Sequence, residues 1–202
     1  EAFYRCTSLP IENNIRYADT YVVEVTDKTL TSYTLKENVR FIGSSAFQNC
    51  KSLTSITIPD SVTSIGVAAF ENCENIVDIN IPEGVTSIGC YAFYGCSSLT
   101  SITIPKGVTS IEKALFQNCS SLESVTIQEG VIIGEGVNFI GEDAFSGCTS
   151  LKSITIPQGV TQIWRDAFKA CSSLAEVYCK PTTPPTLNGT GVFDYGPSSR
   201  KI

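Results

Sequence analysis

A unit of 23 residues repeats along most of this chain. Its phenylalanine stands at Phe47, Phe70, Phe93 and Phe116, then at Phe145 after 29 residues and at Phe168 after another 23. One such unit is too short to bury an apolar side of its own. Its stability must therefore come from stacking on neighbouring units at about 4.8 Å, the spacing between strands of a sheet. The period predicts a long solenoid of similar rungs.

The residues of one unit predict two short extended segments and a tight turn. Residues 53–59 read Leu-Thr-Ser-Ile-Thr-Ile-Pro, in which two isoleucines alternate with polar residues, as in a half-buried strand that a proline ends. Val62 and Ile65 are expected to return inward on a second short extended segment. Ala69 and Phe70 are expected to pack on a helical or 3₁₀ turn before the next unit begins.

The order Cys-x-x-Leu-x-x-Ile-x-Ile-Pro-x-x-Val-x-x-Ile-Gly-x-x-Ala-Phe resembles the BspA-like, or Treponema-type, class of leucine-rich repeats. The segment 179–187, Cys-Lys-Pro-Thr-Thr-Pro-Pro-Thr-Leu, is similar to the terminal segment of such proteins in Bacteroides-type gut bacteria. The resemblance implies a curved, right-handed, β-rich superhelix with short parallel strands on the concave face and short extended and 3₁₀ or helical segments on the other side. It also implies a surface-exposed or secreted protein associated with adhesion.

A single leucine-rich-repeat domain is expected over residues 1–202. Residues 1–29 are interpreted as a partial repeat followed by an irregular hairpin that caps the stack, with residues 21–25 pairing with 30–35. Regular repeats are expected over 30–179, with a six-residue insertion near 131–137. Residues 180–202 are interpreted as a Pro-rich C-terminal cap whose last strand is truncated. The first residues lack the order of a signal peptide, and no apolar run is long enough to cross a bilayer.

Most of the nine cysteines share one position of the repeat. They are Cys6, Cys50, Cys73, Cys96, Cys119, Cys148 and Cys171. A buried free thiol that donates to a backbone carbonyl suits this small inward position better than a disulfide ladder or a metal site. Cys179 aligns with Ile58 and is also expected to be buried. Cys90 falls in a row that tolerates charge, so we expect an exposed thiol, either harmless or available for intermolecular pairing.

Catalysis, cofactors and charged partners are all disfavoured. The chain has no histidine, which removes Ser-His-Asp and Cys-His arrangements and most zinc sites. The carboxylates of Glu142, Asp143 and Asp166 are expected on variable, exposed positions and not in a facing catalytic pair. A net charge of −6 gives no footprint for nucleic acid or an anionic membrane. We therefore predict a monomer that is not an enzyme and holds no metal or cofactor.

Binding is expected on the outward positions of the first strand of each unit. These polar positions are Ser55, Thr57, Asp78, Asn80, Ser101, Thr103, Ser124, Thr126, Ser153, Thr155, Glu176 and Tyr178. Their hydroxyls are expected to contact one another across strands, and as a surface they suit a partner held by hydrogen bonds. Glu123 and Lys152 are expected to form an ion pair of little energetic value.

A loop from the insertion is the second candidate site, with Ile132, Ile133, Gly134, Glu135 and Gly136 at its centre. Such a loop either carries specificity or is a neutral duplication. Phe41, Phe139 and Trp164 interrupt rows of small residues. They either form a sticky patch or pack against the hairpin and the loop.

Two functions remain open. The first is an extracellular or cell-surface interaction module that binds a host or matrix protein or a glycan. The second is a structural spacer without a ligand.

Overall fold

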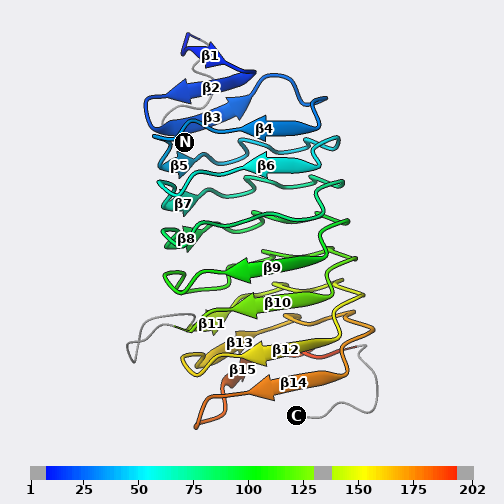
Figure 1. Cartoon of the computed structure of the whole chain (residues 1–202). Coiled ribbons are helices and arrows are strands. Elements are labelled where there is room, and N and C mark those ends of the chain that lie inside the picture. Colours follow the sequence, from blue (N-terminus) through cyan, green and yellow to red (C-terminus); the bar gives the residue numbers. More distant parts are fainter. Residues whose placement is uncertain (1–7, 130–137, 195–202) are drawn as a thin grey trace.

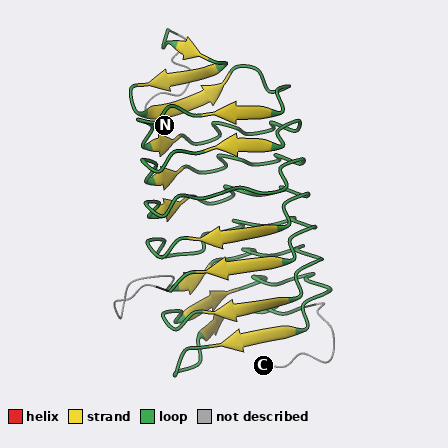
Figure 2. Ribbon diagram, viewed as in Figure 1, coloured by secondary structure: helices red, strands yellow, loops and turns green. Residues whose placement is uncertain are grey.

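The computed structural model describes residues 8–129 and 138–194 as a stack of rungs, each of which contributes one segment to each of two rows of short parallel strands. Figure 1 shows the rungs in chain order, with the N-terminal strands at one end and β14 at the other. None of the described residues forms a helix, and none of them provides a helix that could cross a membrane (Figure 2). The predicted leucine-rich-repeat solenoid is confirmed.

The first row forms the face that carries the predicted binding residues, and we call it the strand face. It consists of β4 (Ser32–Thr34), β6 (Ser55–Thr57), β9 (Ser101–Ile104), β10 (Ser124–Ile127), β12 (Ser153–Ile156) and β14 (Glu176–Cys179). The strands pair in parallel with equivalent residues opposite each other, in three blocks: β4 with β6, β9 with β10, and β12 with β14. The first break lies at residues 77–81. The second lies between β10 and β12, where the chain carries its insertion.

The second row runs behind the strand face. It consists of β5 (Phe41–Ile42), β7 (Ser64–Ile65), β8 (Ser87–Ile88), β11 (Phe139–Ile140), β13 (Gln162–Trp164) and β15 (Thr186–Asn188). Its ladder is interrupted between β8 and the single bridge residue Ile111. The adjacent Glu112 occupies a slot that holds glycine in four other rungs. A Cβ built at Gly89 or Gly141 would lie 2.6–2.8 Å from the backbone of the preceding rung, so glycine allows a close approach of the two rungs there. Trp164 occupies the same slot, and β13 nevertheless pairs with β11.

The predicted helical or 3₁₀ segment after the second row is wrong, because the structure has a chain of turns there. Alternate amides from Ser45 to Asn49 donate to the next rung, at 2.8 Å in each case, whereas Ala46, Gln48 and Cys50 donate three residues back. Ser45 and Asn49 have φ values of 58° and 61°. A left-handed residue every fourth position prevents a continuous helix, so the backbone bonds between rungs instead.

The N-terminal segment caps the stack, but not through the predicted pairing. The antiparallel partner of β3 (Tyr21–Val25) is β2 (Ile15–Ala18), which in turn pairs with β1 (Ile11–Glu12). Residues 32–34 instead form β4, in register with the repeats. On its other side β3 pairs in parallel with β5, so it takes the place of a second-row strand. Residues 32–34 pair within the first row, whereas β3 pairs within the second row. Residues 30–35 therefore do not pair with residues 21–25.

The C-terminal described segment continues the stack beyond the last repeat recognised in the sequence. β15 pairs in parallel with β13, and the Phe168 amide donates to the Val192 carbonyl at 2.9 Å. The Phe193 ring stacks on Phe168 with centroids 5.3 Å apart. Residues 186–194 therefore supply the second-row half of a further rung, which the Val-Phe pair could have indicated.

The core is a column of aromatic rings beside a column of thiols. Phe47, Phe70, Phe93, Phe116, Phe145 and Phe168 are fully buried. Neighbouring rings stack with centroids 5.1–5.6 Å apart. The thiols of Cys73, Cys96, Cys119, Cys148 and Cys171 donate to a phenylalanine carbonyl of the preceding rung at 3.1–3.2 Å. The prediction that this cysteine row donates to backbone carbonyls is confirmed for these five residues, while Cys6 lies outside the described residues.

Candidate functional site: the strand face

The structure brings the predicted binding residues together on one face, although they are far apart in the sequence. Ser101 pairs with Ser124 and Thr103 with Thr126 in β9 and β10. Because alternate residues of a strand point to opposite sides, the intervening Ile102 is buried and the Ser and Thr point outward. Ser153 and Glu176 are half-buried, and the other ten predicted residues are exposed.

The serine and threonine hydroxyls of this face have no hydrogen-bond partner within the described part of the chain. This overturns the predicted hydroxyl contacts across the strands. Hydroxyls elsewhere are bonded: Thr54, Thr100 and Thr161 donate to a carbonyl of the preceding rung at 3.0–3.3 Å. Residues at the corners of a rung lie beside such a carbonyl. On the strand face the carbonyls are used by the ladder, and the described outward hydroxyls do not bond to one another. The second row differs, because the Ser87 hydroxyl donates to the Ser64 hydroxyl at 2.8 Å.

The strand face extends one rung further than the sequence analysis recognised. Ser32 and Thr34 of β4 are exposed and lie opposite Ser55 and Thr57. The sequence Ser-Tyr-Thr at residues 32–34 has the same alternation as Ser-Ile-Thr in the repeats, and it could have indicated this additional strand. At the other end Tyr178 is 54% exposed, and its hydroxyl donates to Glu176, which raises the pKa of the tyrosine.

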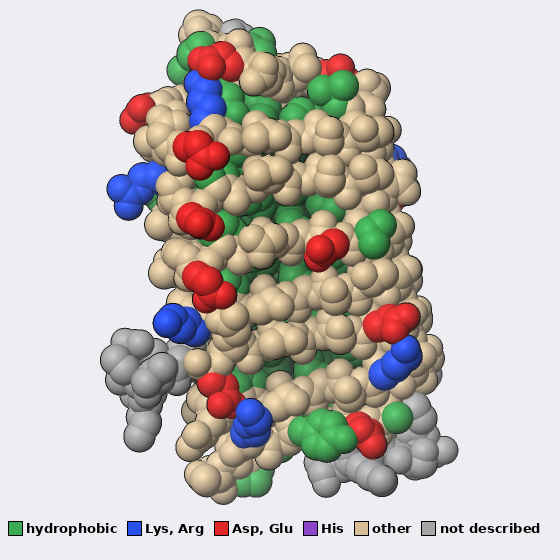
Figure 3. Space-filling model, viewed as in Figure 1, with side chains coloured by type: hydrophobic (Ala, Val, Ile, Leu, Met, Phe, Trp, Pro, Cys, Tyr) green, Lys and Arg blue, Asp and Glu red, His purple; other side chains and the backbone are tan. Residues whose placement is uncertain are grey.

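Charge lies mainly along the borders of the strand face. Figure 3 shows a centre dominated by uncharged polar surface, with most acidic and basic side chains toward its sides. Glu123 and Lys152 flank β10 and β12 and form the predicted exposed ion pair at 2.5 Å. Lys180 pairs with Glu129 at 3.0 Å. Asp78, in contrast, lies on the face and has no ion-pair partner among the described residues.

The second candidate site, the loop at residues 132–136, lies outside the described residues. The three aromatic residues that interrupt rows of small residues differ in their exposure. Phe41 is 39% exposed and stacks on Tyr21 of the N-terminal cap with centroids 6.0 Å apart. Phe139 is half-buried and Trp164 is 44% exposed. The packing interpretation therefore holds for Phe41.

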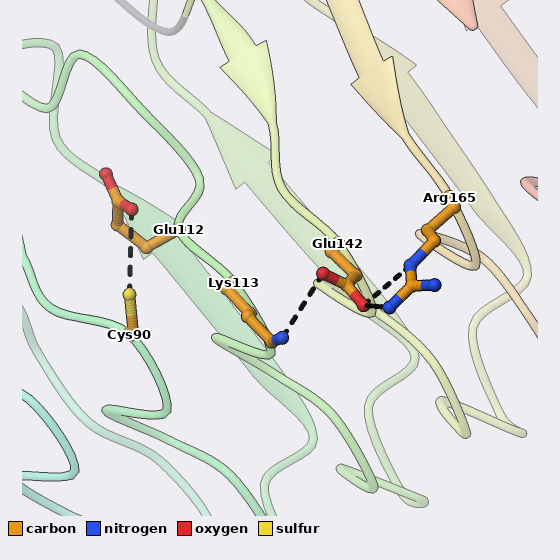
Figure 4. A network of polar contacts seen from close by, with 5 residues as sticks. All are labelled: Cys90, Glu112, Lys113, Glu142 and Arg165. Carbon is orange, nitrogen blue, oxygen red and sulfur yellow. Dashed lines mark hydrogen bonds and ion pairs between the residues drawn. The ribbon is translucent and has the colours of Figure 1, made fainter. Parts of the chain in front are cut away.

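Glu142 was expected to be exposed, but it is half-buried. It forms the centre of an ion-pair network that spans three rungs (Figure 4). The Lys113 Nζ lies 3.2 Å from its Oε2, and the Arg165 Nε donates to its Oε1 at 2.7 Å. These hydrogen bonds hold the pKa of Glu142 below its usual value. The carboxylate is paired with cations, so it is a structural link between rungs.

Asp143 and Asp166 were also expected to be exposed, but the structure places both half-buried in neighbouring rungs. Burial, reinforced by the charge of Asp166, raises the pKa of Asp143. Both carboxyls belong to left-handed turn residues, with φ of 56° at each. No group of three or more metal-binding side chains occurs among residues 8–129 and 138–194.

The two cysteines outside the thiol column differ from one another. Cys90 is half-buried and not exposed as expected, with its Sγ 3.7 Å from Glu112, and burial raises the pKa of its thiol (Figure 4). Cys179 is exposed, so the prediction that it is buried is wrong. Ile156 is covered because β14 pairs with β12, whereas no described strand pairs with the far side of β14.

The short parallel rungs, buried phenylalanine column and outward polar row define a leucine-rich-repeat solenoid. The family model for the BspA type leucine-rich repeat region matches residues 1–83, 26–136 and 129–194, with six copies. The chain belongs to this BspA-type leucine-rich-repeat family. Solenoids of this kind generally mediate protein interactions and are typically non-catalytic. No match is found among curated proteins.

Solved structures of similar proteins come from several bacteria. The leucine-rich-repeat protein of T. pallidum is 26% identical, with a TM-score of 0.81, over 95% of this chain and 92% of that protein. A leucine-rich-repeat protein from Bacteroides ovatus is 34% identical, with a TM-score of 0.70, over 78% of this chain but only 40% of its own. A leucine-rich cell surface protein from Faecalibacterium prausnitzii is 25% identical, with a TM-score of 0.53, over 84% of this chain and 70% of that protein.

Proposed function

We propose that this chain is a non-catalytic, extracellular or cell-surface interaction module that binds a host or matrix protein or a glycan through its strand face. The observation that carries the proposal is the pair of outward hydroxyl rows that have no hydrogen-bond partner among the described residues. Each such hydroxyl is both a donor and an acceptor, and the five rungs of β4, β6, β9, β10 and β12 hold them at fixed positions on a rigid stack. Binding then costs little side-chain ordering.

The location rests on similarity. The F. prausnitzii relative is described as a cell surface protein. The free buried thiols are compatible with this location, because burial raises the thiol pKa to about 11 at Cys50 and well above the usual value at Cys96 and Cys119. A thiol without thiolate character is poorly reactive toward oxidants.

The test is a binding screen of the purified chain against arrays of extracellular matrix proteins and glycans. The face variant Thr103→Lys/Thr126→Lys places two long cations in the centre of the strand face. The control variant Thr149→Lys/Ser172→Lys makes the same charge change at exposed corner residues, whose hydroxyls are already bonded. We expect a saturable hit that the face variant loses and the control retains.

The other outcomes identify the alternatives. A hit that survives in both variants, and that is lost when residues 132–137 are deleted, would place recognition on the loop. Silence of the wild-type chain on both arrays would contradict the binding proposal and favour the structural spacer.

A further inference from the structure

The first break in the strand face coincides with a change of side chains. Strands β6, β9, β10 and β12 of this face all carry Ser-x-Thr, whereas residues 78–80 of the rung between β6 and β9 read Asp-Ile-Asn. Ile79 and Ile81 remain buried, at 4% and 5% exposure, so the rung keeps its place in the stack. Asp78 and Asn80 are both exposed. The substitution therefore changes only what the rung presents to the outside.

The backbone of this rung has lost its ladder. Within residues 77–81, one described backbone hydrogen bond reaches a neighbouring rung, from the Thr100 amide to the Val77 carbonyl at 3.1 Å. No insertion lies here, in contrast to the second break. Asp and Asn are among the residues least compatible with a strand, so the side chains themselves explain the lost pairing. Asp78 and Asn80 lower the strand propensity of this rung and do not improve its packing. Such a combination is typical of positions whose side chains have a function outside the fold.

The chemistry of the two side chains points to a polyhydroxylated partner. Asp78 is a carboxylate that forms no ion pair with any described residue, and Asn80 offers a carbonyl oxygen and an NH₂ group. Free hydroxyls lie on both sides of them, from Ser55 and Thr57 on β6 and from Ser101 and Thr103 on β9. A carboxylate and an amide among hydroxyls can accept from and donate to adjacent sugar hydroxyls. An extended glycan advances per sugar by roughly the spacing of one rung, so successive sugars would meet successive rungs.

We propose that Asp78 and Asn80 are the specificity-determining residues of the strand face and that they bind a neutral, extended glycan. This rests on the proposed function and commits it to one class of ligand. The charges support neutrality: the strand face carries acidic Asp78 and Glu176, and the chain has a net charge of −6, so sulfated or sialylated glycans are repelled. A protein partner would instead be expected to meet an apolar centre, which this face lacks.

The experiment uses the full chain and the variant Asp78→Ser/Asn80→Thr, which restores the Ser-x-Thr pattern of the neighbouring rungs. Its control is Asp60→Ser/Asn75→Thr, which removes the same two side-chain types from exposed turn positions. Each chain is titrated with the neutral glycans that bind the wild type on the array, in 50 mM and 500 mM NaCl, and is then melted without ligand.

Opposite effects on binding and stability are expected in the Asp78/Asn80 variant. Its Kd for the glycan rises about tenfold or more, because charge-assisted and amide hydrogen bonds are lost. Its Tm rises by about 2–4 °C, because the ladder can close. The control changes neither, and salt leaves the wild-type Kd within about twofold.

Three results would overturn the inference. Unchanged glycan affinity in the Asp78/Asn80 variant would remove these residues from recognition. A wild-type chain that binds only proteins, or only anionic glycans, would contradict the ligand class while leaving the proposed function intact. Silence on every array would overturn the proposed function and this inference together.

Discussion

Replacement of Phe93 by alanine tests the column of stacked rings at its middle. Phe93 is fully buried, with the rings of Phe70 and Phe116 each 5.6 Å away, and its carbonyl accepts the Cys119 thiol at 3.1 Å. Burial of such a ring contributes about 1.5–3 kcal/mol. Each stacked pair adds about 0.5–1.5 kcal/mol, and the cavity left behind adds a further cost. We therefore expect Phe93→Ala to reduce the free energy of unfolding by about 3–5 kcal/mol.

The matched control is Thr103→Ala on the strand face, where the hydroxyl has no hydrogen-bond partner in the described part of the chain. It should change stability by less than about 0.5 kcal/mol. Calorimetry and urea unfolding followed by circular dichroism measure both variants. For a chain of this length the Phe93 change corresponds to a Tm lower by roughly 6–20 °C. Equal effects of the two substitutions, or a loss below about 1 kcal/mol for Phe93→Ala, would refute the assignment of inward and outward positions.

Three further predictions concern the thiols, the ion-pair network and the turns. In a chain with Cys6→Ser, Ellman's reagent at pH 8 should modify the exposed Cys179 first. Cys119 is buried and its thiol pKa is raised, so it should react only on unfolding. Simultaneous reaction of the two thiols would contradict the packing. Glu142→Gln should reduce stability by less than about 1 kcal/mol at pH 7. Because its pKa is lowered in the folded chain, the stabilisation is present above pH 4–5 and lost as pH falls through the folded pKa, so the two melting curves should converge near pH 3. Ala170→Gly should stabilise the chain by roughly 0.5 kcal/mol, since φ is 56° there, and a lower Tm would show that the lost methyl contacts dominate.

The repeat period determined most of the fold in advance. Regular spacing of Phe47 to Phe168 was sufficient to predict the stack. The alternation of apolar and polar residues within each unit predicted the outward Ser and Thr rows. The periodic cysteines indicated correctly that Cys73 and its equivalents donate to backbone carbonyls. These features follow from a local pattern of side chains that each rung repeats, so no knowledge of long-range pairing was needed.

The ends and the breaks could not be predicted in the same way. Cys179 occupies a core position of the repeat, but its exposure depends on whether a further strand follows, which its own unit does not encode. The partner of residues 21–25 depended on which neighbouring row was free, since both 15–18 and 30–35 have suitable patterns. The lost ladder at residues 77–81 coincides with Asp78 and Asn80, two residue types that are poorly compatible with a strand, and the repeat pattern distinguishes these positions only as polar.

The central claim is that ligands contact the strand face, and photocrosslinking tests it most directly. A benzophenone amino acid is placed at position 103 of one chain and, as a control, at position 172 of another, and each chain is irradiated with the strongest ligand from the arrays. We expect a covalent adduct with the ligand from position 103 and none from position 172. An adduct from position 172 alone, or equal yields from both, would contradict recognition through the strand face.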